Sequence, residues 1–206
     1  MTVQDVARVA MTPRGRKKRE AILDAGVKVF MAEGYAASMD RVAAEAGVAK
    51  QTLYSHFGSK EGLFHALFDR YKQQSLRVLD PAGDLAAELT AFGEDLLRRI
   101  FDPEILGVQR LMIAQAGAFP DLARIFYDAG PGHVRTTLAA FLRSRMEAGA
   151  LRSDDAAAAA EDLIGLLQGG RRQRHLFGVE PAPEPAELRG IAERAVAVFL
   201  RAYTTR

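Results

Sequence analysis

One segment, residues 38–57, decides the fold: SMDRVAAEAGVAKQTLYSHF. Ser38 is a good helix N-cap, and Asp40 lies in the first turn, where the helix dipole favours an anion. Gly47 follows the last apolar residue of this helix, where the chain must reverse and a left-handed backbone costs least. A second helix then places Leu53 and Phe57 on one apolar face. The segment therefore predicts two short helices joined by a tight turn.

The outer face of the second helix is polar, carries side chains that can donate or accept hydrogen bonds, and is almost free of acidic groups. It consists of Lys50, Gln51, Thr52, Tyr54, Ser55 and His56. Such a face suits a helix that lies in the major groove of DNA. The spacing of Ala43, Gly47 and Leu53 is that of a helix-turn-helix. Two short helices that pack for structural reasons alone can show the same spacing. The flanking residues must therefore show whether this segment is a DNA-binding helix-turn-helix.

The segment and its flanks carry four motifs: F-x-x-x-G-Y at 30–35, D-x-V-A-x-x-A-G-V at 40–48, T-L-Y-x-H-F at 52–57 and S-K-E-x-L at 59–63. With these motifs the chain resembles the tetracycline-repressor (TetR) family of bacterial transcription regulators. The match covers roughly residues 19 to 68 without a gap. It implies that Ser38, Tyr54, His56 and Lys60 hold DNA phosphates, and we add Met39 to this predicted face.

Composition and charge agree with this hypothesis. The chain has 206 residues, no Cys and a net charge of +2. Residues 1–60 carry ten basic and six acidic side chains, hence +4, whereas the remainder carries eighteen and twenty, hence −2. A basic N-terminal third is typical of a protein that presents one end to a polyanion. No apolar run approaches the length of a membrane span, so we expect no membrane association and a cytoplasmic location.

A dense basic run, PRGRKKR at 13–19, enters the first helix. Such a run can be a solubilising tail, but cations at a helix N-terminus oppose the helix dipole and do not serve local stability. We therefore predict that Arg16 and Lys17 contact DNA. The predicted organisation is a disordered segment at 1–13, a DNA-binding domain at 14–59 and a regulatory domain at 60–206, with a connecting helix at 60–79.

The C-terminal two thirds is predicted to be a succession of helices with clear start and stop signals. Helices are expected at 84–101, from Pro103 to about 117, at 120–129, after Pro131 to 148, at 154–177 and at 185–203. Part of this region is similar to an AefR-like subgroup of the family, on the residues 114–122, 127, 130–131 and 166–170. The predicted fold class is all-α: a three-helix helix-turn-helix domain followed by a helical-bundle domain for ligand binding and dimerisation.

We find no catalytic constellation, and we expect no enzyme activity, no metal and no cofactor. The four His residues have no pairing suited to a metal. Aromatic and Met side chains in the middle helices are interpreted either as ordinary core or as the lining of an effector cavity. The candidate effector residues are Phe92, Leu96, Met112, Gln115, Phe126, Tyr127, His133 and Thr137.

The last two predicted helices carry more apolar surface than one domain face needs, which predicts a homodimer joined as a four-helix bundle. The candidate interface residues are Leu163, Leu166, Leu167, Gly170, Val196 and Phe199. Small residues such as Gly165 and Gly169 are expected to let a partner helix approach closely.

The sequence therefore predicts a DNA-binding transcription regulator that binds double-stranded DNA at a palindromic operator. We expect a repressor that is released by a small-molecule effector. Three alternatives remain: a regulator or architectural protein without ligand control, an activator, and a helical binding or enzymatic protein whose helix-turn-helix is incidental. The acid-poor helix face argues against the last of these, and the large second domain argues against a purely architectural role.

Overall fold

A computed structural model describes residues 12–73 and 79–204 of the chain. Within these ranges the regular structure is entirely α-helical, which confirms the predicted fold class. The chain forms two compact units, divided in the sequence between Asp69 and Arg70. Among the described residues, no helix combines the length and the apolar character that crossing a bilayer would require.

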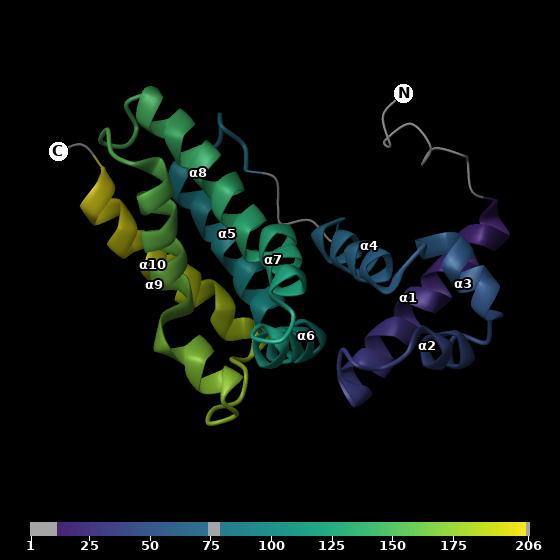
Figure 1. Ribbon diagram of the computed structural model, residues 1–206. Coiled ribbons are helices and arrows are strands. Elements are labelled where there is room, and N and C mark those ends of the chain that lie inside the picture. Colours follow the sequence, from purple (N-terminus) through teal and green to yellow (C-terminus); the bar gives the residue numbers. More distant parts are fainter. Residues whose placement is uncertain (1–11, 74–78, 205–206) are drawn as a thin grey trace. The chain divides into compact units, whose positions relative to one another are not determined.

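The first unit contains the N-terminal helices (Figure 1). They are α1 (Pro13–Glu33), α2 (Met39–Glu45), α3 (Lys50–Phe57) and α4 (Lys60–Gln73), the last of which continues past the division. Thr12 caps α1, since its side chain accepts a hydrogen bond from the backbone N–H of Gly15 at 3.2 Å. Proline at the first helical position costs no hydrogen bond. The basic run therefore lies within helix α1 itself.

An aromatic cluster joins α4 to the rest of the first unit. The Phe64 ring lies 4.4 Å from the Phe30 ring and 4.9 Å from the Tyr35 ring, measured between ring centroids. Leu63 and Phe64 are both buried. Because these α4 side chains complete the core, the compact unit extends to Asp69, whereas the predicted DNA-binding domain ends at residue 59.

The second unit contains α5 (Leu85–Ile100), α6 (Pro103–Gln115), α7 (Pro120–Ala129), α8 (Pro131–Glu147), α9 (Ala156–Leu176) and α10 (Pro185–Tyr203). Aspartates cap three of these helices: Asp84 for α5, Asp102 for α6 and Asp155 for α9. Each carboxylate accepts hydrogen bonds from backbone N–H groups that have no partner within the helix. The starts of these helices therefore coincide with capping residues and prolines that can be recognised in the sequence.

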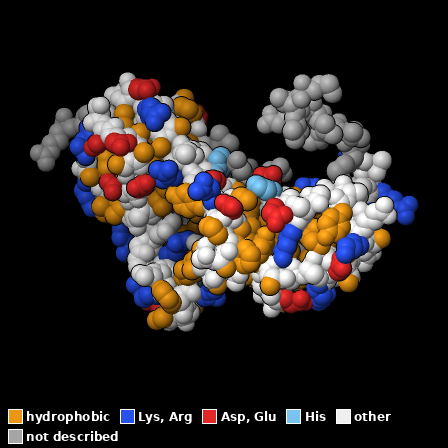
Figure 2. Space-filling view, in the orientation of Figure 1, with side chains coloured by type: hydrophobic (Ala, Val, Ile, Leu, Met, Phe, Trp, Pro, Cys, Tyr) orange, Lys and Arg blue, Asp and Glu red, His pale blue; other side chains and the backbone are white. Residues whose placement is uncertain are grey.

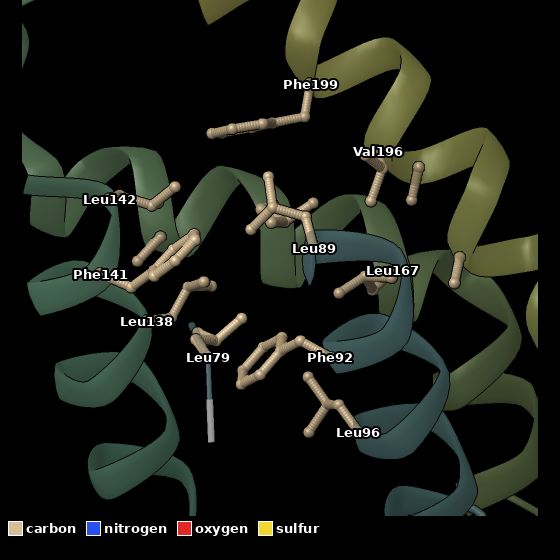
Figure 3. Packing of buried hydrophobic residues seen from close by; sticks show 14 of the residues in the cluster. Leu79, Leu89, Phe92, Leu96, Leu138, Phe141, Leu142, Leu167, Val196 and Phe199 are labelled. Atoms are coloured by element: carbon tan, nitrogen blue, oxygen red, sulfur yellow. The ribbon is translucent and has the colours of Figure 1, made fainter. Parts of the chain in front are cut away.

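The core of the second unit is built around α5 (Figure 3). Leu89 and Phe92 of α5 are fully buried, and labelled side chains of α8, α9 and α10 point toward them. At Gly93, an added Cβ would lie 2.7 Å from Leu167 of α9 and 3.2 Å from Ala192 of α10. The missing side chain at Gly93 therefore permits the close packing of three helices.

The segment that opens the second unit is held by several contacts. Leu79 is buried in the core, and the buried carboxylate of Glu88 accepts a hydrogen bond from the backbone N–H of Asp80 at 3.0 Å. Arg145 of α8 donates a hydrogen bond to the carbonyl of Pro81. Leu79 is not helical, so the connecting helix that we predict through residue 79 does not reach its expected end. Residues 74–78 of that prediction lie outside the described residues.

Helix α9 is kinked, which corrects the prediction of one continuous helix. Gly169 adopts φ 51° and ψ −162°, a conformation outside the helical region that glycine reaches without steric cost. The glycines in this helix were predicted to allow a close helix contact. Within the protomer, however, a Cβ added at Gly165 or Gly169 would meet no atom within 4 Å.

Candidate nucleic-acid interface

The turn between α2 and α3 has the geometry of a helix-turn-helix. The Ser38 hydroxyl accepts a hydrogen bond from the backbone N–H of Arg41 at 3.1 Å and so caps α2. Gly47 has φ 63°, and the N–H of Val48 donates to the carbonyl of Ala43 at 3.0 Å, which closes the turn. A left-handed residue at this point is favourable only for glycine. These contacts fix the direction in which α3 leaves α2.

Helix α3 has one buried and one solvent-facing side. Leu53 is fully buried and Phe57 is 9% exposed, so these two side chains attach the helix to the core. The predicted polar side chains form the other side: Lys50, Gln51, Tyr54 and Ser55 are exposed, while Thr52 and His56 are half-buried. Helix α3 itself contains no acidic residue. This side can therefore approach a polyanion and offer both donors and acceptors to base edges.

Two side chains on this surface already have partners. The Ser55 hydroxyl donates to the carbonyl of Thr52 at 2.8 Å, which leaves its oxygen as an acceptor. Lys50 forms an ion pair with Asp40 of α2 at 2.7 Å, and hydrogen bonding to that carboxylate raises the pKa of Lys50. Both members of the pair are well exposed, so the pair is weak and can exchange for a phosphate. From the sequence, Asp40 is expected only to stabilise the first turn of its helix, and its contact with Lys50 is not predicted.

Arg41 is a further residue whose contacts are not predicted from the sequence. Its guanidinium bridges Glu33 of α1 at 2.8 Å and Glu45 of α2 at 3.2 Å. The pairing with Glu45 has the four-residue spacing that a helix brings together, but the pairing with Glu33 depends on how α1 and α2 pack. Arg41 therefore orients α2 against α1 and is already engaged by carboxylates.

Met39 and Lys60, both predicted to face DNA, make contacts within the first unit instead. Met39 is only 6% exposed, so its side chain belongs to the core. Lys60 donates a hydrogen bond to the carbonyl of Tyr35, and its Nζ lies 4.3 Å from the centroid of the Tyr35 ring and 5.6 Å from that of Phe30. Burial lowers the pKa of Lys60. This cation is thus engaged within its own unit, against aromatic rings.

Charged side chains outside α3 are mixed in sign. Arg16 and Lys17 are exposed on the first turns of α1. Elsewhere on the face shown in Figure 2, basic and acidic side chains are interspersed. The feature that distinguishes the candidate interface is the outer side of α3, which carries no acidic residue, on its helix-turn-helix. Within the described residues, no group of three or more metal-binding side chains is present.

Comparisons with known proteins identify both units. Residues 22–67 match the family model described as bacterial regulatory proteins, tetR family, and residues 87–205 match that of the AefR-like transcriptional repressor, C-terminal domain. The chain belongs to the TetR family. It is thus a DNA-binding transcriptional regulator of a family that is not enzymatic, as the residues 38–57 and their flanks predict.

Relatives of known structure or sequence match nearly the whole length of this chain. The chain is similar to the flavonoid-responsive regulator FrrA, with 31% identity, a TM-score of 0.79 and coverage of 93% of this chain and 99% of that one. A TetR-family regulator from Pseudomonas syringae shows 28% identity, a TM-score of 0.75 and coverage of 92% and 98%. The uncharacterised regulator YvkB of Bacillus subtilis is 23% identical over 188 residues, which are 90% of this chain and 97% of YvkB.

In the TetR-family C-terminal unit, the candidate effector residues do not share one environment. Phe92 and Leu96 are buried in the helical core, and Met112 is 3% exposed. Tyr127 is 48% exposed, whereas the remaining candidates, Gln115, Phe126, His133 and Thr137, are half-buried. Phe92 and Leu96 belong to the buried cluster that α5 forms with α8, α9 and α10, so they contribute to the core of the protomer.

The candidate dimer residues are also divided. Leu163, Leu167, Val196 and Phe199 are at most 2% exposed and pack inside their own protomer, so they cannot reach a partner without unfolding. Leu166 is 41% exposed, and Gly170 is exposed as well. Val198 of α10, which is not one of the predicted interface residues, is 37% exposed. Periodicity identified the apolar helices but not which of their apolar residues point outward.

Proposed function

We propose that this TetR-family regulator is a homodimeric repressor that binds a palindromic operator and is released by a small-molecule effector. The observation that carries the proposal is the acid-free, solvent-facing side of α3, held by the capped α2 and the Gly47 turn. Repression is supported by the AefR-like repressor model that matches residues 87–205. Operator DNA in a bacterium lies in the cytoplasm, where we therefore place the protein.

Roles on the DNA follow from position along the helix-turn-helix. Gln51 and Thr52 lie in the first turn of α3, the part of a recognition helix that reaches base edges. Ser38, Tyr54, Ser55 and His56 are placed at sugar and phosphate oxygens, together with Lys50 after it exchanges Asp40 for a phosphate. Arg16 and Lys17 add sequence-independent attraction.

A homodimer is supported by the apolar side chains that α9 and α10 leave exposed. Leu166 and Val198 are the large members of this face, and the exposed glycines 165 and 170 leave room for close approach. A two-fold axis through this face would present two copies of α3 to two half-sites related by the same symmetry. We propose this face in place of the four buried residues described above.

Control by a small molecule is supported by the similarity to FrrA, which is described as flavonoid-responsive. An effector can weaken DNA binding only if it binds better to a conformation that does not bind DNA, and DNA must then weaken effector binding by the same factor. An architectural protein or an activator without ligand control is the alternative, and it predicts no such reciprocity.

Selection of operators from a random DNA pool with the purified protein tests the proposal. We expect enrichment of an inverted repeat, and a fluorescence-anisotropy titration should show binding to the selected site at least about a thousandfold tighter than to random DNA. Equal affinity for selected and random DNA would contradict sequence-specific regulation. In-vitro transcription from a promoter that carries the selected site then distinguishes repression from activation.

A further inference from the structure

One acidic side chain lies directly beside the first turn of α3. Asp40 belongs to the first turn of α2, and its carboxylate reaches the first residue of α3, Lys50. The Lys50 ammonium lies 2.7 Å from one carboxylate oxygen and donates a hydrogen bond to the other at 2.9 Å. Lys50 is 59% and Asp40 is 60% exposed, so both lie on the outer surface of the helix-turn-helix. The only Lys or Arg of α3 is thus paired with a carboxylate on the surface predicted to approach DNA.

This ion pair contributes little to the packing of α2 against α3. The N–H of Val48 already closes the turn by donating to the carbonyl of Ala43, and the buried Leu53 attaches α3 to the core. An ion pair between two well-exposed side chains is weak, because water screens both charges. A lysine at a helix N-terminus also opposes the helix dipole. The pair therefore matters through its position beside the DNA-facing helix rather than through fold stability.

We propose that Asp40 is a specificity-determining residue that withholds Lys50 from DNA of the wrong sequence. Non-specific binding consists almost entirely of phosphate contacts, so each cation that stays paired within the protein weakens it. The Asp40 carboxylate is tethered beside Lys50, whereas the phosphates of random DNA have no fixed position relative to α3. The carboxylate therefore competes at a high effective concentration. The proposal rests on the proposed function, because it requires an operator, and it adds a role on DNA for Asp40.

The operator releases Lys50 by fixing the position of α3. Gln51 and Thr52 follow Lys50 in the first turn, where they are proposed to contact base edges. Once these contacts hold the helix in the groove, a phosphate stays beside Lys50, and the ammonium exchanges one anionic acceptor for another. The carboxylate of Asp40 is then repelled by the DNA backbone, and only the operator supplies base contacts that offset this repulsion. Asp40 therefore weakens binding to random DNA more than binding to the operator.

Asp40→Asn tests the proposal, because asparagine keeps the size of the side chain and removes its charge. Fluorescence anisotropy on the full-length protein compares random duplex DNA with the selected operator over a series of salt concentrations. On random DNA we expect the affinity to rise about fivefold or more and the slope of log K against log salt to steepen by about 0.9, since one more phosphate contact forms. On the operator the slope should stay the same and the affinity should rise less than about twofold, so the specificity ratio falls.

Two further variants show whether the effect runs through Lys50. Asp69→Asn is the matched control: it removes the same charge from an exposed aspartate of α4, in the first unit, and should leave the specificity ratio and both slopes unchanged. Lys50→Gln provides the background for a double-mutant cycle. In that background Asp40→Asn should no longer steepen the slope, because no lysine is left to release.

Equal gains in affinity on random DNA and on the operator would overturn the proposal, since Asp40 would then be a general repulsive charge. An unchanged slope on random DNA would overturn it, and so would a steeper slope that persists without Lys50. A loss of operator affinity alone would mean that Asp40 contacts a base directly, which also contradicts the proposal. Failure to select any operator refutes the proposed function instead, and the slope on random DNA still decides whether Asp40 withholds Lys50.

Discussion

Lys60 donates a hydrogen bond to the backbone carbonyl of Tyr35, and its ammonium lies over the Tyr35 ring. The contact ties the first residue of α4 to the segment between α1 and α2. The hydrogen bond gives the carbonyl of Tyr35 a donor, and the cation–π contact offsets part of the desolvation that lowers the pKa of Lys60. The residue that the TetR motif suggests for phosphate binding therefore contributes first to the fold of the DNA-binding unit.

Lys60→Met tests this role. We expect the free energy of unfolding of the first unit to fall by about 1–3 kcal/mol, because the carbonyl of Tyr35 loses a charged donor. The slope of log K against log salt for DNA binding should stay unchanged, whereas Lys17→Met should reduce it by about 0.9. A Lys60→Met protein of normal stability with a reduced slope would restore Lys60 to the DNA interface.

Gly62 permits the short connection between α3 and α4. A Cβ at this position would overlap the backbone carbonyl of Phe57, which cannot swing away as a flexible side chain can. Gly62→Ala should therefore lower the free energy of unfolding by about 1–3 kcal/mol or more, measured by urea denaturation. Gly117→Ala is the matched control, because a Cβ there meets no atom within 4 Å. Equal effects of the two substitutions would contradict a steric role for Gly62.

Gln51→Ala addresses sequence readout. Its amide can donate and accept at once, which suits a bidentate contact with a base edge. We expect a loss of about 1–3 kcal/mol on the selected operator and a much smaller loss on random DNA, measured by anisotropy at one salt concentration. An equal loss on both DNAs would mean that Gln51 contacts only the backbone.

Leu166→Glu addresses the dimer. A carboxylate at this exposed position would place two like charges near the proposed two-fold axis, in an interface that excludes water. Sedimentation should show a monomer with unchanged helical circular dichroism and a large loss of operator affinity. Ile113→Glu, at a side chain of α6 that is 57% exposed, should leave the dimer intact. A dimeric Leu166→Glu protein that still binds its operator would place the interface elsewhere.

Tyr203 gives the second unit a dependence on alkaline pH. A 2.6 Å hydrogen bond to Asp162, followed by burial and the negative charge of that carboxylate, raises the pKa of Tyr203 to about 12. The unfolded chain releases this proton near pH 10. The contribution of the hydrogen bond is therefore complete below about pH 10 and is lost as the pH rises toward 12.

Tyr203→Phe removes this contribution. The variant should be less stable than the wild type by about 1–2 kcal/mol at pH 8, because the carboxylate loses a donor. The difference between the two proteins should shrink from pH 10 upward, as measured by urea unfolding of both at each pH. A difference that is constant across this range would show that the phenol does not hold its proton through Asp162.

Short-range patterns were enough to predict most helix ends and the polar side of α3. Ser38, Gly47 and Asp102 act through hydrogen bonds or backbone angles within a few residues of themselves, so their effect is visible without knowledge of the fold. Leu53 and Phe57 likewise identify the buried side of α3 by their spacing alone. The polar side opposite them then follows from helix geometry.

Contacts between distant segments decided the rest. Leu163, Leu166 and Leu167 look equivalent as apolar residues of one helix. Only Leu166 points outward, because the packing of α8, α10 and α5 against α9 selects the buried side. The motif alone predicts that Lys60 contacts a phosphate. In the structure, its ammonium instead donates to the carbonyl of Tyr35, twenty-five residues earlier in the chain. Periodicity places a residue on a face, but only the three-dimensional neighbours of that face determine whether it meets core, solvent or ligand.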